Sequence, residues 1–167
     1  MIRSYDGIEP EIADSAYVDE SAVVIGDVTI GEEASVWPGV VLRGDEGHIE
    51  VGEGTNLQDN VVCHEGTEIG PYVTVGHTAI VHAATVEERA VVGMSATVLD
   101  GSVIGDHSIV AAGSVVTENT EIPPYSLAVG TPASVKTTLE ESGWFEAADH
   151  YVELARKHEA TSEVLEE

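Results

Sequence analysis

Three histidines in the middle of the chain could share one metal ion. His64 and His82 are eighteen residues apart, and His77 lies between them. Imidazole nitrogen is a common ligand of divalent metals, and three histidines around an open position form a catalytic zinc site. Whether these three side chains can meet depends on the fold of the chain that carries them.

A six-residue repeat surrounds the histidines and extends over most of the chain. Each unit opens on an aliphatic residue, once on a cysteine, and a small or β-branched residue lies two places before the next opening residue. The opening residues are Val18, Val24, Ile30, Val36, Leu42, Val51, Leu57, Cys63, Ile69, Val75, Val81, Val86, Val92, Val98, Ile104, Val110, Val116 and Ile122. A period of six fits neither an α-helix nor a simple strand. It is typical of a β-solenoid, in which stacked repeats bury a shared apolar core.

Three repeat units make one triangular coil of eighteen residues, because six extended residues span about 20 Å, one side of the triangle. The phase of the repeat slips by three residues between Leu42 and Val51, and by one residue between Val81 and Val86. About six coils are therefore expected between residues 16 and 125.

The segments that flank the repeat differ from it in pattern. Residues 1–15 are expected to form a lead-in without regular structure, and Pro123-Pro124 stops the repeat. Residues 128–133 are interpreted as a connecting loop. Thr138–Glu141 is a capping-box pattern, which predicts a helix that runs from there to about residue 158.

The chain is therefore predicted to have two parts. Residues 1–133 form a β-helix domain with its lead-in and connecting loop. Residues 134–167 form a C-terminal helix packed on the β-helix, because one side of that helix is partly apolar. The helix is followed by an acidic tail, residues 160–167, which is expected to fray.

The eighteen-residue coil places His64 and His82 on one face, about 4.8 Å apart in the stacking direction. Both follow an inward-pointing opening residue and should point outward. His77 lies on a different face, with Asp59, eighteen residues earlier, directly under it. A threefold assembly could set the His64–His82 column of one subunit against His77 of its neighbour. The alternative is that these outward histidines are simply solvated surface residues.

The composition limits the classes of partner. The chain has 167 residues, with 31 acidic and six basic side chains and a formal net charge of −25. This charge argues against nucleic acid and anionic membranes as partners. It also suggests a protein from a halophile, because concentrated salt screens the repulsion between acids. Cys63 opens a repeat unit and is predicted to be buried and inert. The N-terminal residues lack the apolar core of a signal peptide, which predicts a cytoplasmic protein.

The sequence resembles the γ-class carbonic anhydrases over nearly its whole length. The resemblance rests on Arg43-Gly-Asp-Glu46, Asn56-Leu-Gln-Asp59, His64, and Val75-Gly-His77 with Val81-His82. It implies an all-β fold, a left-handed parallel β-helix with a C-terminal α-helix, assembled as a homotrimer. Metal sites would lie between subunits, with His64 and His82 from one subunit and His77 from the next. The implied ion is Zn²⁺, with Fe²⁺ or Co²⁺ as alternatives.

The reaction implied by the resemblance is the reversible hydration of CO2 to bicarbonate by a metal-bound hydroxide. Gln58 would orient the hydroxide or the substrate, and Glu46 matches a position in the proton network of the active site. Arg43, Asp45 and Asp59 resemble ion-pair residues at the subunit interface, where a structural role is at least as plausible as a catalytic one.

The proton-transfer residue is the main departure from the family pattern. His64–Ile69 stays in phase, which leaves no room for the acidic loop that carries a shuttle glutamate in the best-known member. Glu65 is the only acid nearby and is expected on an unfavourable side of the strand. Tyr151 matches the position of a helix tyrosine near the metal in relatives without the loop, with simple packing as the alternative.

Two other functions stay open at this point. The first is a hexapeptide-repeat acyltransferase or a coenzyme A thioester hydrolase on the same fold. Acyl transfer needs one catalytic histidine, so it gives no reason for a stacked pair plus His77. The second is a trimeric scaffold with little or no catalysis that retains the metal for stability.

Overall fold

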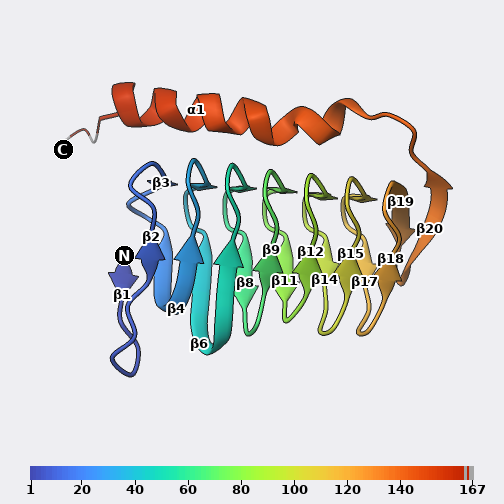
Figure 1. Cartoon of the computed structure of the whole chain (residues 1–167), viewed down its shortest axis with the longest axis horizontal. Helices are drawn as coiled ribbons and strands as arrows, with labels where there is room; N and C mark the ends of the chain where they lie inside the picture. The colour runs from blue at the N-terminus through green and yellow to red at the C-terminus, as the bar shows by residue number, and fades with distance from the viewer. Residues whose placement is uncertain (164, 166–167) are drawn as a thin grey trace.

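The computed structural model describes residues 1–163 and 165, which form a parallel β-helix with a C-terminal helix (Figure 1). Short strands stack on three faces of a prism. One face is an eight-stranded sheet, which we call the helix face. In chain order it contains β3 (Tyr17–Val18), β5 (Ser35–Val36), β7 (Asn56–Leu57), β10 (Thr74–Val75), β13 (Val91–Val92), β16 (Ile109–Val110), β19 (Ser126–Gly130) and β20 (Ala133–Thr138).

The other two faces share a 12-stranded sheet, because β4 (Val23–Ile30) and β6 (Val41–Val51) each pair with strands of both faces. The histidine face holds the first parts of β4 and β6 together with β1 (Ile2–Arg3), β8 (Val62–His64), β11 (Ile80–His82), β14 (Thr97–Val98) and β17 (Val115–Val116). The third face holds their last parts together with β2 (Glu11–Ile12), β9 (Glu68–Ile69), β12 (Thr85–Val86), β15 (Val103–Ile104) and β18 (Glu121–Ile122).

The opening residues of the repeat point inward and stack from coil to coil, as predicted. Val24, Leu42, Cys63, Val81 and Val98 form one fully buried column. Burying one such aliphatic side chain stabilises the fold by about 1.5–3 kcal/mol. A single coil could not exclude water from these side chains, so stacking fixes the register of every coil on the next.

Both predicted phase slips appear in the strand register. Leu42 pairs with Cys63, twenty-one residues later, and Val81 pairs with Val98, seventeen residues later. The three additional residues of the first slip form a bulge in β6, where residues 45–48 face a single residue of β4. The bulge is important for function because it carries several of the candidate site residues.

Two segments that were predicted to be irregular contain strands. Residues 1–15 include β1 and β2, which pair with β4 as a partial first coil. Residues 128–133, predicted as a loop, belong largely to a hairpin of β19 and β20. The reason is that Ala128 continues the buried column above Val110, so the chain completes one more coil side before it reverses.

The C-terminal helix begins later than the capping-box pattern predicted, because Thr138 still belongs to β20. Ser142 caps a 3-10 turn, η1 (Gly143–Glu146), and its Oγ accepts a hydrogen bond of 3.2 Å from the Trp144 amide. The helix α1 (Ala147–Thr161) follows. The predicted fraying of the tail at positions 164, 166 and 167 lies outside the described residues.

The helix α1 runs back along the helix face toward the first coils, as predicted (Figure 1). Trp37 packs between α1 and the helix face. Its ring contacts Tyr151 edge-on at a centroid distance of 5.7 Å and His158 edge-on at 5.0 Å. Arg156 donates a hydrogen bond of 2.9 Å to Glu33. No helix among the described residues is long and apolar enough to cross a membrane.

Candidate metal centre

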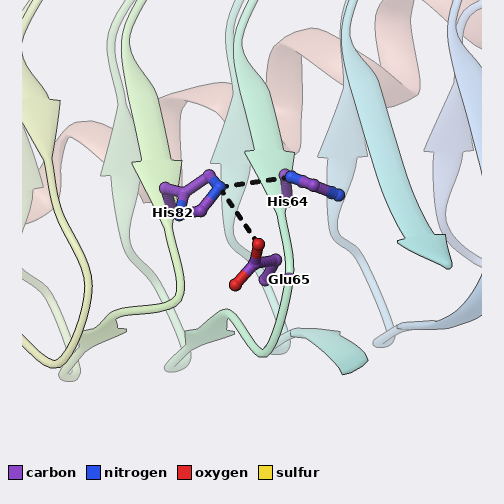
Figure 2. A group of neighbouring side chains, drawn as sticks. All are labelled: His64, Glu65 and His82. Carbon is purple, nitrogen blue, oxygen red and sulfur yellow. Dashed lines mark hydrogen bonds and ion pairs between the residues drawn. The ribbon is translucent and has the colours of Figure 1, made fainter. Parts of the chain in front are cut away.

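His64 and His82 lie side by side on the histidine face, as their spacing predicts. They end β8 and β11 and are register partners in adjacent parallel strands. His64 Nδ1 and His82 Nε2 are 3.2 Å apart (Figure 2). The two ring planes are inclined at 68°, so nitrogen atoms rather than ring faces approach each other.

The other nitrogen of each ring faces a carboxylate. His82 Nδ1 lies 2.7 Å from Asp100 Oδ1, and His64 Nε2 lies 3.2 Å from Asp45 Oδ1. An ionised carboxylate only accepts hydrogen bonds, so these two nitrogens carry the ring protons. Arg43 agrees with this assignment, because its guanidinium donates to His64 Nδ1 at 3.3 Å. His64 Nδ1 and His82 Nε2 are therefore the two nitrogens without a proton, and the lone pair of His64 Nδ1 accepts from Arg43 in the absence of a metal.

Two unprotonated nitrogens cannot hydrogen-bond to each other, but a metal ion that both of them bind satisfies both lone pairs. Zinc binds imidazole nitrogen at ~2.0–2.1 Å with tetrahedral angles, which sets two ligand nitrogens about 3.3–3.4 Å apart. The observed separation of 3.2 Å between His64 Nδ1 and His82 Nε2 matches this value closely. The two residues therefore fit a divalent transition metal.

Glu65 is a third candidate ligand in the same chain. Its Oε1 is 3.7 Å from His82 Nε2, and ligand atoms of His64, Glu65 and His82 lie within 4.8 Å of one another (Figure 2). The expectation that Glu65 lies on an unfavourable side is wrong. Glu65 follows the last residue of β8 with φ +57°, so the alternation of side chains along a strand no longer applies to it.

Arg43, Asp45 and Glu46 come from β6 and its bulge. Arg43 donates a hydrogen bond of 2.8 Å to Asp45 Oδ2 within the chain. Desolvation raises the pKa of Asp45, but hydrogen bonds from Arg43 and from its own backbone outweigh it, so the pKa lies below its usual value. Asp45 therefore stays ionised beside His64. Glu46 is exposed on the bulge.

His77 stands at the corner after β10, where its Nδ1 lies 2.8 Å from Asp59 Oδ2. This contact confirms that Asp59 lies under His77, on another column than the His64–His82 pair. Among the described residues, the ligand atoms that lie close together belong to His64, Glu65 and His82, and His77 is not one of this group. Its side chain is 41% exposed, so its free Nε2 can reach another molecule.

Gln58 and Tyr151 lie on the helix-face side of the molecule, away from the face that carries His64. They line a mostly apolar hollow of about 330 Å³ between α1 and the strands β10, β13 and β16. Gln58 Nε2 donates a hydrogen bond of 3.1 Å to Asn56 Oδ1. Burial raises the pKa of Tyr151, and the negative charge of Asp59 adds to the shift, so the hydroxyl keeps its proton.

Asp100 is a site residue that the sequence analysis missed. Val98 pairs with Val81, so the seventeen-residue step places Leu99 rather than Asp100 beside His82. Asp100 reaches His82 Nδ1 from the corner that follows β14. The alternation of side chains along a strand does not predict the direction of a corner residue. The sequence feature that points to Asp100 is its position, an acid about one coil after the candidate ligand His82.

The chain is similar to known proteins over most of its length. Residues 9–44 and 83–118 match the family model described as bacterial transferase hexapeptide (six repeats). The chain is 41% identical over 145 residues to the carbonic anhydrase of Geobacillus kaustophilus, covering 84% of this chain and 80% of that protein. The solved structure of a hexapeptide transferase family protein from Anaplasma phagocytophilum superposes with a TM-score of 0.92 at 41% identity, covering 94% and 97% of the two chains.

Two plant relatives are longer than this chain. Gamma carbonic anhydrase 2 and gamma carbonic anhydrase 1, both mitochondrial and from Arabidopsis thaliana, are 46% and 44% identical to it over 162 and 164 residues. These matches cover 89% and 90% of this chain but 58% and 60% of the relatives. From this identity, together with the six-residue repeat and the stacked histidines, we conclude that the chain belongs to the γ-class carbonic anhydrase family of hexapeptide-repeat proteins.

Proposed function

We propose that this protein is a metal-dependent carbonic anhydrase that catalyses the reversible hydration of CO2 to bicarbonate. The observation that carries the proposal is the 3.2 Å approach of His64 Nδ1 to His82 Nε2, with Asp45 and Asp100 holding the ring protons on the other two nitrogens. The relatives that are 41–46% identical to this chain are named carbonic anhydrases, which supports the same reaction.

His64 and His82 would hold the ion together with His77 from a neighbouring copy in a homotrimer. Asp59 occupies Nδ1 of His77, which leaves Nε2 for the ion. Zn²⁺, or alternatively Fe²⁺ or Co²⁺, would lower the pKa of a bound water toward ~7 and so supply a nucleophile at neutral pH. Glu65 is the competing third ligand, because it is already close to His82 in the same chain.

Other residues would bind the substrate and move protons. Gln58 presents its amide at the wall of the apolar hollow, which suits the orientation of a small uncharged molecule. Tyr151 keeps its proton and would act as a hydrogen-bond donor rather than as a base. Glu46 is exposed on the β6 bulge and would pass protons to solvent.

The proposed protein is a homotrimer. Arg43, Asp45 and Asp59 would form ion pairs between subunits of the homotrimer. A cytoplasmic location, a halophilic source and the lack of nucleic-acid or membrane partners stay predictions from the sequence.

Acyl transfer and thioester hydrolysis are less favoured for this chain, because neither reaction gives a role to two adjacent imidazoles with unprotonated nitrogens 3.2 Å apart. A trimeric scaffold that retains the metal would share the site but would not turn over CO2.

The experiment that tests the proposal measures metal content and CO2 hydration on the same preparation. The purified protein is assayed in high salt before chelation, after chelation, and after reloading with Zn²⁺, Fe²⁺ or Co²⁺. We expect bound metal, hydration that chelation removes, and recovery with at least one ion. Metal without hydration would favour the scaffold or the thioester hydrolase, and a protein that binds no metal under any condition would contradict the proposal.

A further inference from the structure

Asp100 makes the shortest of the contacts between the stacked imidazoles and their carboxylates. Its Oδ1 lies 2.7 Å from His82 Nδ1, whereas Asp45 Oδ1 lies 3.2 Å from His64 Nε2. Asp45 also accepts from Arg43, while the side chain of Asp100 has no partner other than His82 among the described residues. Asp100 stands at a corner on the coil above, so the coil stack itself holds the carboxylate over the ring.

We propose that Asp100 is a positioning residue that fixes the tautomer and the ring orientation of His82, so that Nε2 presents its lone pair toward His64. A neutral imidazole has one N–H, and the hydrogen bond made by one nitrogen decides whether the other can bind a metal. With the proton held on Nδ1 by Asp100, Nε2 is available without rearrangement. Without that acceptor, the proton is free to occupy Nε2 and block the ligand position.

The histidine pair needs this control more than an isolated ligand does. The two inner nitrogens, 3.2 Å apart, must both lack a proton to bind one ion, and a proton on either of them would turn the contact into an ordinary hydrogen bond. That hydrogen bond would compete with the ion for both imidazoles. Asp100 excludes it from the His82 side, as Asp45 does from the His64 side.

The inference rests on the proposed metal site, and its test has two readouts. The first is the affinity of purified full-length protein for Zn²⁺, measured by competition with a chromophoric chelator. The loss of a carboxylate that orients a ligand histidine typically weakens metal binding by about 10–100-fold, and we expect this for Asp100→Ala. Asp100→Asn should lose less, because its amide oxygen still accepts a hydrogen bond.

The second readout is the tautomer of His82 in metal-free protein, given by the ¹⁵N shifts of its ring. We expect a proton on Nδ1 in the wild type and a mixture of tautomers in Asp100→Ala, a change that a merely structural role would not produce. The matched control is Asp106→Ala, because Asp106 makes a similar 2.8 Å contact with His107 Nδ1 away from the site. The control should leave both the Zn²⁺ affinity and the His82 shifts unchanged.

The outcomes separate the inference from the proposed function. Unchanged Zn²⁺ affinity and an unchanged tautomer in Asp100→Ala would overturn the role of Asp100 and leave the carbonic anhydrase proposal intact. Wild-type protein that binds none of Zn²⁺, Fe²⁺ and Co²⁺ would overturn the proposed function, while the His82 tautomer would still decide the role of Asp100. Melting of the metal-free variants checks that each one folds.

Discussion

All three candidate histidine ligands have a carboxylate partner on a neighbouring coil. Asp45 faces His64, Asp100 faces His82, and Asp59 faces His77. In each case the carboxylate occupies one ring nitrogen and so determines which nitrogen can bind a metal. The sequence makes the three imidazoles available, but the carboxylates select the atoms that would do the binding.

The identity of the third ligand can be decided with two substitutions. If His77 comes from a neighbouring subunit, His77→Ala should lose the metal from every site while the β-helix stays folded, because His77 is at an exposed corner. Glu65→Gln should then keep the metal. Elemental analysis and circular dichroism measure the two effects.

The opposite pattern would assign the third ligand to Glu65. Metal that persists in His77→Ala and disappears in Glu65→Gln would show a site built within one chain and would contradict the interfacial assignment.

Cys63 should make the fold sensitive to alkaline pH. Burial raises the pKa of its thiol from 9.0 to about 12, so the folded protein holds this proton more tightly than the unfolded chain. The stabilisation is complete below pH 9 and is lost as pH rises from there toward 12. At one pH unit above the unfolded pKa the loss is roughly 1 kcal/mol.

The unfolding free energy of Cys63→Val, measured with urea, should therefore fall less between pH 8 and pH 10 than that of the wild type. Valine suits the position, because Cys63 stacks between Leu42 and Val81 in the buried column. Equal pH slopes for the two proteins would show that the thiol is not the cause.

Site residues that lie eighteen residues apart in an unslipped part of the stack could be predicted from the sequence, whereas Glu65 and Asp100 could not. The pairing of His64 with His82 follows from the coil length alone, as does Asp59 under His77. Glu65 and Asp100 lie just beyond strand ends, where side-chain direction depends on corner dihedrals rather than on alternation.

At the scale of elements, the repeat phase was the most informative signal. It predicted the coils and both slips, the first of which the structure forms as the bulge of β6, because every opening residue must reach the core. It failed for the strands β1, β2, β19 and β20, which are short or stand at the ends of the stack. The helix start was misplaced because a local capping pattern lost to the pairing of Thr138 with Ser126.

Trp37 should be the main anchor of α1. Its ring is only 6% exposed, its Nε1 donates to Ser35 Oγ at 3.1 Å, and it packs against Tyr17, Tyr151 and His158. Trp37→Ala should cost about 3–5 kcal/mol of unfolding free energy. Hydrogen exchange should accelerate in α1 more than in the strands.

The control for this prediction is Trp144→Ala, because Trp144 is 63% exposed and should change stability by no more than about 0.5 kcal/mol. Similar losses from the two tryptophans would show that burial against the helix face does not anchor α1.

At the scale of the molecule, the acidic surface should make stability depend on salt. The formal charge is −25, and Glu50 and Glu68 are adjacent register partners on β6 and β9. Like charges directly opposite each other destabilise a strand pair by about 0.2–1 kcal/mol. Salt shortens the screening length from ~10 Å at 0.1 M to ~3 Å at 1 M, so the melting temperature should rise across this range.

Glu68→Gln should raise the melting temperature at 0.1 M salt and have less effect at 1 M. Glu121→Gln is the matched control, because Glu121 pairs with the uncharged Val103 on the same face. Identical effects of the two substitutions would mean that the repulsion is spread over the whole surface instead of being local to the Glu50–Glu68 pair.

The antiparallel strand β20 at the end of the helix face has a consequence for how molecules meet (Figure 1). A parallel edge strand could template a further coil from a second molecule, and repetition of that contact would give an open filament. β20 presents a hydrogen-bond pattern that a parallel coil does not match. The reversal should therefore disfavour the end-to-end stacking of coils into a filament, even in concentrated salt.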